Sequence, residues 1–400
     1  MNKLILALAA LLPFIGNQPD PADCSVCHNK PAKMAKLGVD SHSGFRFGRS
    51  DTKLVDRIFK DDVPVYPIYW IEGQHIKMGF AAADFPLWPG GDEPDRGAGK
   101  PQELRSLANG KLAMKPYARV HAYLERAEET YARVQELLKV EDADFPRLDQ
   151  TGKPVQPKGA PNGYMGEGPY LGQAAKYELL FLPGPSEYGR YIKHPNGLAG
   201  EYLNQALVKD TDAMSTALHL SDGTLWDDTI VTGYMMHFLA HAMIRGYKHN
   251  SYTTPPWLDA GFAHVIEGEA NPSGNSFCGD GSAAHEGGKL NNFTDEVKVR
   301  LRKNHGPYFE ELVAKESLSD FTLEDHVFAW SMVRFLVEEH PRAFAQISAD
   351  LKGLSKSKRP VGVIMLRHAQ QDAFARNLDM TYGEFDKAWS KWAKKLRGQR

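Results

Sequence analysis

Short apolar runs in the first half of the chain predict β-strands. Residues 65–71 and 75–80 are rich in aromatic and β-branched side chains and flank the turn-forming pair Glu72-Gly73. Residues 177–182 form a third apolar run, which ends at Pro183-Gly184-Pro185 and predicts a buried strand. The sequence therefore indicates strands before its midpoint.

Other segments have apolar residues at helical spacing. Residues 117–140 carry apolar side chains three or four positions apart, which predicts a long amphipathic helix. Residues 230–246 and 256–267, the latter with proline at its start, predict two more helices, and residues 294–392 read as largely helical. Segments 86–101, 141–170 and 271–292 are rich in Gly, Pro, Ser or Asn and predict loops. Together these elements predict an α+β fold.

Composition limits the class of partner. A chain of 400 residues can hold two or three subdomains with a sizeable core. Its 48 basic and 50 acidic residues nearly cancel, so no overall field would draw it onto nucleic acid or an anionic membrane. We expect neither partner.

The first residues resemble an export signal. Met1-Asn2-Lys3 is a short basic start, and the apolar run at 4–16 is too short for a membrane span, which needs about 20 residues. We expect residues 1–21 to be removed, with cleavage near 16–21, and the protein to be periplasmic or extracellular. An uncleaved anchor is the alternative, because no clean small-x-small site is visible. No later segment is expected to enter a membrane.

Two of the three cysteines lie in the pattern CSVCH. In a C-x-x-C-H motif, here Cys24, Cys27 and His28, two thioethers attach a c-type haem and the histidine binds its iron. Such attachment takes place outside the cytoplasm, which agrees with export. The motif predicts covalent haem c in a segment at 22–60. The alternatives are a Cys24–Cys27 disulfide and a partial zinc site, the weaker of the two because no second cysteine pair could complete it.

The second axial ligand of such a haem has several candidates. His42 lies within Ser41-His42-Ser43, and the segment resembles multihaem c-type cytochromes, in which a Ser-x-His phrase often follows the motif and supplies bis-His ligation. Met34, His75 and Met78 are further candidates. His42 could equally be a surface residue.

Residues 176–393 resemble the gluzincin metallopeptidases, the thermolysin and aminopeptidase-N superfamily. His237 and His241 stand where the family has its paired zinc ligands, and WLDAGFA at 257–263 matches the family phrase Trp-Leu-x-Glu-Gly-x-Ala. A later phrase at 326–336 and the closing aromatic residues at 385–392 also fit. The resemblance implies a small β-rich N-terminal part at 61–175, a core with central active-site helices at 176–293 and a helical C-terminal part at 294–400.

The departures from the family fall on its chemical positions. Phe238 replaces the general base, Ala260 the third zinc ligand and His326 the oxyanion-stabilising tyrosine that the resemblance places there. A phenylalanine cannot accept a proton, and general base catalysis alone contributes about 10²–10⁴-fold. Ordinary peptide hydrolysis is therefore not expected.

A rebuilt metal site is one reading of the remaining histidines. His264 lies one helical turn beyond Ala260, so we expect His237, His241 and His264 to hold zinc, copper or iron, with His326 as a fourth or outer ligand. The other reading is core histidines in an inactive cleft. The acidic residues Asp259, Glu267 and Glu269 could orient the imidazoles or form a solvated edge. Cys278 and His285, in the loop at 271–292, could border the cleft or lie on the surface.

Three functions follow from these features. The first is an exported haem c pseudopeptidase with an electron-transfer role and a redox partner protein. The second is an inactive module that binds a peptide or glycan. The third is a residual metal-dependent hydrolase.

Overall fold

The computed structural model describes most of the chain after residue 18. The described residues are 19–59, 67–81, 115–157, 163–197, 205–208, 214–220, 228–248, 254–272, 276–277, 292–303, 306, 308–354 and 362–396. Most of the predicted signal segment, the loop at 86–101, Cys278 and His285 lie outside them.

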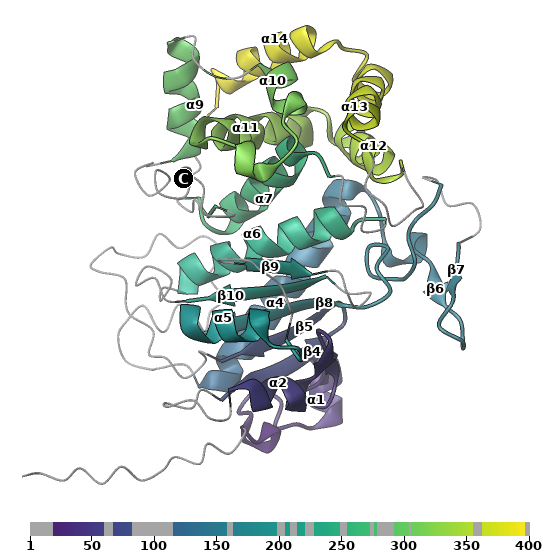
Figure 1. The fold of residues 1–400 in the computed structure, drawn as a ribbon, viewed down its shortest axis with the longest axis vertical. Coiled ribbons are helices and arrows are strands. Elements are labelled where there is room, and N and C mark those ends of the chain that lie inside the picture. The colour runs from purple at the N-terminus through teal and green to yellow at the C-terminus, as the bar shows by residue number, and fades with distance from the viewer. Residues whose placement is uncertain are drawn as a thin grey trace, which may run out of the picture.

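A mixed six-stranded sheet organises the first half of the molecule (Figure 1). Its strand order is β1 (Val39–Ser41), β4 (Tyr69–Gly73), β5 (Ile76–Phe80), β8 (Tyr177–Leu182), β10 (Ser215–His219) and β9 (Gln205–Val208). Strands β5, β8 and β10 run parallel, whereas β1–β4, β4–β5 and β10–β9 pair antiparallel. The predicted strands at 75–80 and 177–182 are confirmed, and the strand predicted at 65–71 begins at Tyr69 among the described residues.

Side chains of β8 alternate between the two faces of this sheet, as the pleat of a strand requires. Leu180 and Leu182 enter an apolar cluster beneath α2 (Thr52–Ile58) and α5 (Pro185–Lys193). Leu179 and Phe181 enter the larger core, which α4 (Pro116–Leu138) and α6 (Asp228–Gly246) cover. The strand is buried on both faces, which explains its unbroken apolar sequence.

Helix α4 confirms the prediction made for residues 117–140. Pro116 stands at its first position, where a missing backbone N–H costs nothing, and Lys139 ends the helix in a left-handed conformation with φ of 55°. The apolar stripe faces α6 and the strands β4 and β5. The helix therefore crosses the face of the sheet, and its side chains contact both the strands and the helices of the second half.

The second half of the chain is helical, as predicted. Helix α7 (Pro256–Ala270) lies on α6, and α11 (Leu323–Glu339) lies on α7 (Figure 1). The other helices described in this half are α9 (Phe293–Arg302), α10 (Phe309–Ala314), α12 (Pro341–Lys352), α13 (Val363–Leu378) and α14 (Tyr382–Ala393). Helices α9, α12 and α14 contact α11, α10 contacts α7, and α13 packs on α12.

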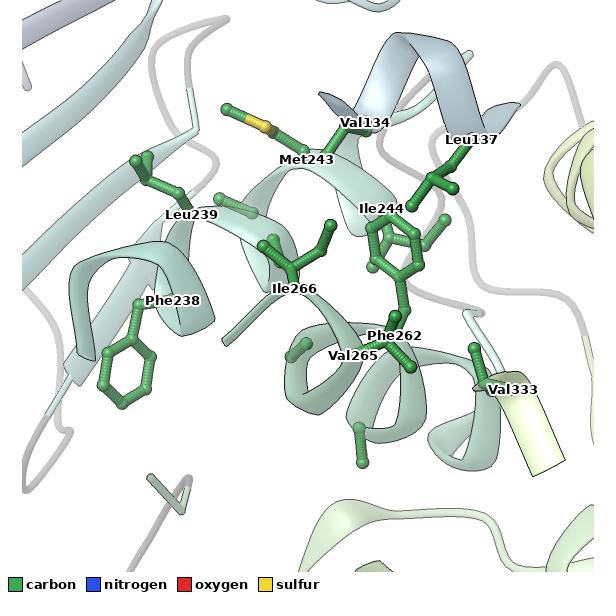
Figure 2. Close-up of a cluster of buried hydrophobic side chains, with 14 of the residues drawn as sticks. Val134, Leu137, Phe238, Leu239, Met243, Ile244, Phe262, Val265, Ile266 and Val333 are labelled. Carbon is green, nitrogen blue, oxygen red and sulfur yellow. The ribbon is translucent and has the colours of Figure 1, made fainter. Parts of the chain in front are cut away.

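Close packing fixes the position of α7 between α6 and α11. Figure 2 shows Ile266 between α6 and α7, with Val134 and Leu137 of α4 on the far side of α6. Gly261 lets α11 approach closely, because a Cβ there would lie 2.5 Å from the carbonyl oxygen of Ala329. Helices that are packed on several sides carry apolar residues around most of their circumference, as α6 and α7 do, and the polar side chains between them are buried.

Short elements complete the description. They are the 3₁₀ turns η1 (Pro21–Asp23), η2 (Asp142–Asp144) and η4 (Leu318–Asp320), the helix α1 (Pro31–Lys36), and two small pairs, β2 (Arg46–Phe47) with β3 (Ser50–Asp51) and β6 (Arg147–Leu148) with β7 (Pro154–Val155).

The α+β class is confirmed. The main sheet takes strands from three of the predicted segments, 22–60, 61–175 and 176–293, so these segments share one sheet. Among the described residues, no helix has both the length and the apolar character that a membrane crossing requires.

Candidate metal centres

Two clusters of potential metal ligands are buried in the described part of the chain. One lies between α6, α7 and α11. The other joins the N-terminal segment to α4 and includes the cysteines of the CSVCH motif.

His237 and His241 lie one turn apart on α6 and face α7, with 1% and 0% of their surfaces exposed. Their Nε2 atoms are 3.2 Å apart. The Nδ1 atom of His241 lies 2.7 Å from Oδ1 of Asp259, and Oδ2 of Asp259 accepts a hydrogen bond from Nε of Arg245 at 2.7 Å. Burial opposes ionisation of Asp259, but Arg245 and His241 hold the pKa of that carboxyl below its usual range. The His241 ring is thus fixed by a charged pair.

His237, His264 and Glu267 form the tightest group in this layer. Oε2 of Glu267 lies 3.1 Å from Nδ1 of His237 and 3.5 Å from Nδ1 of His264. The three side chains offer donor atoms that all lie within 4.8 Å of one another. Oε1 of Glu267 is occupied by the hydroxyl of Ser276 at 2.6 Å, so the carboxylate is held with Oε2 toward the imidazoles. This is a two-histidine, one-carboxylate arrangement.

The charges of this group are unbalanced. Burial lowers the pKa of His237 and brings that of His264 to about 4, so both rings are neutral at neutral pH. Burial opposes ionisation of Glu267, yet the two facing imidazoles lower its pKa to about 2. Glu267 pairs with no lysine or arginine among the described residues. A buried carboxylate facing two neutral imidazoles is an environment that a divalent cation would complete.

His326 lies at the start of α11 and reaches the same layer. Its Nδ1 is 3.1 Å from Nε2 of His264, and only 3% of the residue is exposed. The helix begins there because Thr322 caps it and Asp325 bonds back to the cap, a reciprocal pair of hydrogen bonds. His326 therefore lies beside His264 in this buried layer.

The structure brings the four predicted histidines together, but the compact group of ligand atoms is not the predicted one of His237, His241 and His264. The compact donor set contains His237 and His264 with Glu267, which from the sequence was expected either to orient the imidazoles or to form a solvated edge. His241 contacts this set through His237, and His326 contacts it through His264. Glu267 lies one turn after His264 on the same helix, so helical spacing was the signal that could have identified it.

Positions 238 and 260, where the sequence resemblance implies a general base and a third zinc ligand, hold no acidic group. Phe238 is buried, and its ring meets Tyr234 edge-on at 4.5 Å between centroids. Ala260 is fully buried and offers no ligand atom. A zinc ion bound in the usual family manner therefore does not fit these residues.

The second cluster contains Cys24, Cys27, His42 and His121. Sγ of Cys27 lies 2.9 Å from Nε2 of His42, Sγ of Cys24 lies 3.3 Å from Nε2 of His121, and the two sulfur atoms are 3.4 Å apart. One ligand atom from each of the four lies within 4.8 Å of all the others. Both cysteines are free thiols with no exposed surface.

His28, predicted as the iron ligand, lies apart from this cluster. It is exposed, with a left-handed backbone at φ of 53°. His75, one of the alternative ligands, binds Glu128 and Asp142, and Met78 lies in the core of the sheet. His121 lies within the helix predicted at 117–140 and was not predicted as a ligand. A histidine in a buried stripe was the available signal.

Comparisons with known proteins add no identification. No protein family, no curated protein and no solved structure matches the chain.

Proposed function

We propose that this chain is a metal-binding protein of gluzincin-like build, in which His237, His264 and Glu267 form a rebuilt metal centre. The observation that carries the proposal is the Oε2 atom of Glu267, which lies 3.1 Å and 3.5 Å from the Nδ1 atoms of two buried imidazoles and pairs with no lysine or arginine among the described residues. A divalent ion would supply that balance. In this proposal, the family's lost ligand at Ala260 is replaced from two turns farther along α7.

The donor set limits the metals that suit this centre. Two histidines and a glutamate bind zinc in catalytic sites, and two histidines with one carboxylate and open positions suit ferrous iron. Soft copper(I) prefers sulfur ligands, and this cluster contains none. Zinc and ferrous iron are therefore the proposed occupants.

The proposed protein is not a peptidase of the family type. Phe238 occupies the position of the general base, and the neighbouring ring of Tyr234 packs against it. Because a hydrocarbon ring cannot accept a proton from bound water, the metal would bind without the partner that makes it a peptidase. A gluzincin fold whose metal serves another purpose is the proposal that these residues support.

The predictions of export and of an electron-transfer role remain predictions. Export follows from the residues at 1–21, and the redox role follows from the CSVCH motif with His28 as an iron ligand. The surroundings of Cys24 and Cys27 favour a different role for that motif.

Metal binding to Glu267→Gln tests the centre directly. Purified full-length protein is loaded with zinc, or with ferrous iron under anaerobic conditions, and the ion is located by anomalous diffraction and counted by elemental analysis. We expect the substitution to weaken binding between α6 and α7 by more than about 100-fold, beyond the 10–100-fold typical of an outer partner. An ion that binds this variant as tightly as wild type would refute the proposal.

Glu269→Gln is the matched control for that variant. Glu269 lies on the same helix but pairs with Arg133 near the surface, so its substitution should leave the ion in place. Peptidase assays with a broad peptide library should show no cleavage by either protein. Zinc-dependent cleavage that disappears in His237→Ala would contradict the assignment of a lost base.

A further inference from the structure

We propose that Cys24, Cys27, His42 and His121 form a closed tetrahedral zinc site that fastens the N-terminal segment to α4, in the place where the motif predicts haem. This proposal is independent of the centre proposed for His237, His264 and Glu267. It assigns the ligand His121, which lies far from the motif in sequence.

The distances among the four donors suit one small ion. Zinc–sulfur bonds of about 2.3 Å and zinc–nitrogen bonds of about 2.0–2.1 Å at tetrahedral angles put neighbouring donors about 3.3–3.8 Å apart. The sulfur atoms are 3.4 Å apart, Cys24 lies 3.3 Å from His121, and Cys27 lies 2.9 Å from His42. The two distances from Cys24 are close to these values, the distance between Cys27 and His42 is shorter, and all four donor atoms lie within 4.8 Å of one another, so a small separation of Cys27 from His42 would let them surround one ion.

The His42 imidazole is held in an orientation that suits metal binding. Its Nδ1 atom lies 3.3 Å from the carbonyl oxygen of Trp70, which can accept the Nδ1 hydrogen and leave the lone pair of Nε2 toward Sγ of Cys27. The Nε2 atom of His121 lies beside Sγ of Cys24 on the other side of the cluster.

The four ligands come from three separate parts of the chain. Cys24 and Cys27 lie in the turn before α1, His42 follows β1, and His121 lies on α4. Cys24 and His121 are 97 positions apart. An ion bound by all four would cross-link the N-terminal segment to the long helix, and a site with four protein ligands leaves no open position for catalysis.

The same geometry disfavours haem at these cysteines. A porphyrin joined to both sulfur atoms needs open space beside them, but the rings of His42 and His121 lie there, with centroids 5.3 Å apart. Both cysteines are completely buried, whereas His28 is exposed. The motif's cysteines and its histidine therefore face different surroundings, and a zinc site uses the first two residues without the third.

A pair of histidine variants distinguishes zinc from haem. The full-length protein is expressed in the periplasm of a host that attaches c-type haem, so that both occupants can compete, and Cys278→Ser serves as the background. Glu267→Gln is added to this background to weaken the other proposed centre, and we then expect one tightly held zinc with two sulfur and two nitrogen neighbours by X-ray absorption. His121→Ala should lose this zinc, whereas His28→Ala should retain it in full.

Two further measurements keep the test independent of folding. His121→Cys should keep the ion with three sulfur neighbours, because zinc accepts such a site. Cobalt substitution should give a sulfur-to-metal charge-transfer band that His28→Ala leaves unchanged and Cys27→Ser weakens. Among the described residues, these two cysteines alone supply sulfur for that band.

Three results would overturn the proposal. The first is covalent haem that survives acid-acetone extraction and changes its spectrum in His28→Ala. The second is a Cys24–Cys27 disulfide without metal in protein prepared under reducing conditions with zinc added. The third is zinc whose absorption spectrum shows no sulfur neighbours.

Discussion

The two buried clusters differ in what holds their ligands in place. In the helical cluster, His237, His264 and Glu267 lie on two long helices that pack together on apolar side chains. In the N-terminal cluster, Cys24, Cys27 and His42 lie in turns beside helices of six and seven residues and strands of two and three. Packing can form the first cluster without an ion. The second has little regular structure of its own.

This contrast has a consequence for stability. Short segments bury little apolar surface, so a bound ion can contribute much of the free energy that keeps them folded. Long packed helices gain that free energy from their contacts, and an ion between them changes it less. We therefore expect metal removal to affect the two regions unequally.

The largest expected effect is local unfolding around the cysteines after metal removal. Structural zinc in small domains contributes apparent binding free energies of about 10–16 kcal/mol, so its loss should release the segment at 24–42. Hydrogen exchange with and without chelator should show protection lost there and retained in α6 and α7. Equal loss in both regions would contradict the comparison, and His28→Ala is the control that should behave as wild type.

A core substitution should affect the helical region without touching its ligands. Phe262 is fully buried and stacks on Phe344 with centroids 5.8 Å apart. Phe262→Ala should lower the free energy of unfolding by about 3–5 kcal/mol, measured by urea denaturation. Ile364→Ala, at a residue that is 75% exposed, should change it by less than about 0.5 kcal/mol. A small loss in Phe262→Ala would show that packing does not pre-form this cluster.

The ion pair between Asp259 and Arg245, behind His241, should contribute less to the free energy of unfolding than the Phe262 side chain does. Asp259 is buried and Arg245 is partly exposed, so Asp259→Asn should cost about 2–3 kcal/mol, below the 3–5 kcal/mol typical when a fully buried pair is broken. The control is Glu338→Gln, which removes the exposed partner of Arg334 and should change stability by less than about 0.5 kcal/mol. Urea denaturation measures both, and equal effects would contradict the role assigned to Asp259.

The smallest expected effect is a pH dependence of stability due to His75, a half-buried histidine between two carboxylates. Burial lowers the pKa of His75, but the hydrogen bonds and charges of Glu128 and Asp142 outweigh it and raise the pKa overall. The rings of Tyr131, stacked at 3.9 Å, and Tyr170, edge-on at 6.4 Å, face it as well.

The sign of this pH dependence follows from the raised pKa. Its stabilisation is fully present below the unfolded value of about 6.5 and is lost as pH rises through the folded pKa. Titration by NMR should therefore show a raised pKa that falls in Glu128→Gln. Glu129→Gln, which removes the exposed partner of Arg126, should leave it unchanged. An unshifted His75 in the wild type would contradict the prediction.

Much of the fold could be predicted from local pattern. The helix at 117–140 and the strand at 177–182 were predicted nearly to their observed ends, because helical spacing and an unbroken apolar run are local signals. Strands β9 and β10 and the helix α5 were missed. They are short, and their structure depends on pairing and packing with distant segments.

The candidate metal centre between α6 and α7 could likewise be predicted only in part. Their residues His237, His241, His264 and His326 were found from motif positions, and the structure places all four in one buried layer. Motif spacing could not show that Glu267 turns Oε2 toward two of them, because its orientation depends on the hydrogen bond from Ser276.

The sequence by itself determined the elements and the residue types available for chemistry, since periodicity and motif spacing are properties of neighbouring positions. Only the tertiary structure decided which of those residues meet. His121 reaches Cys24 across 97 positions because α4 crosses the sheet beside the N-terminal turn, and His28 is turned outward although it adjoins Cys27. Such meetings depend on how elements pack, and packing joins residues that no local pattern connects.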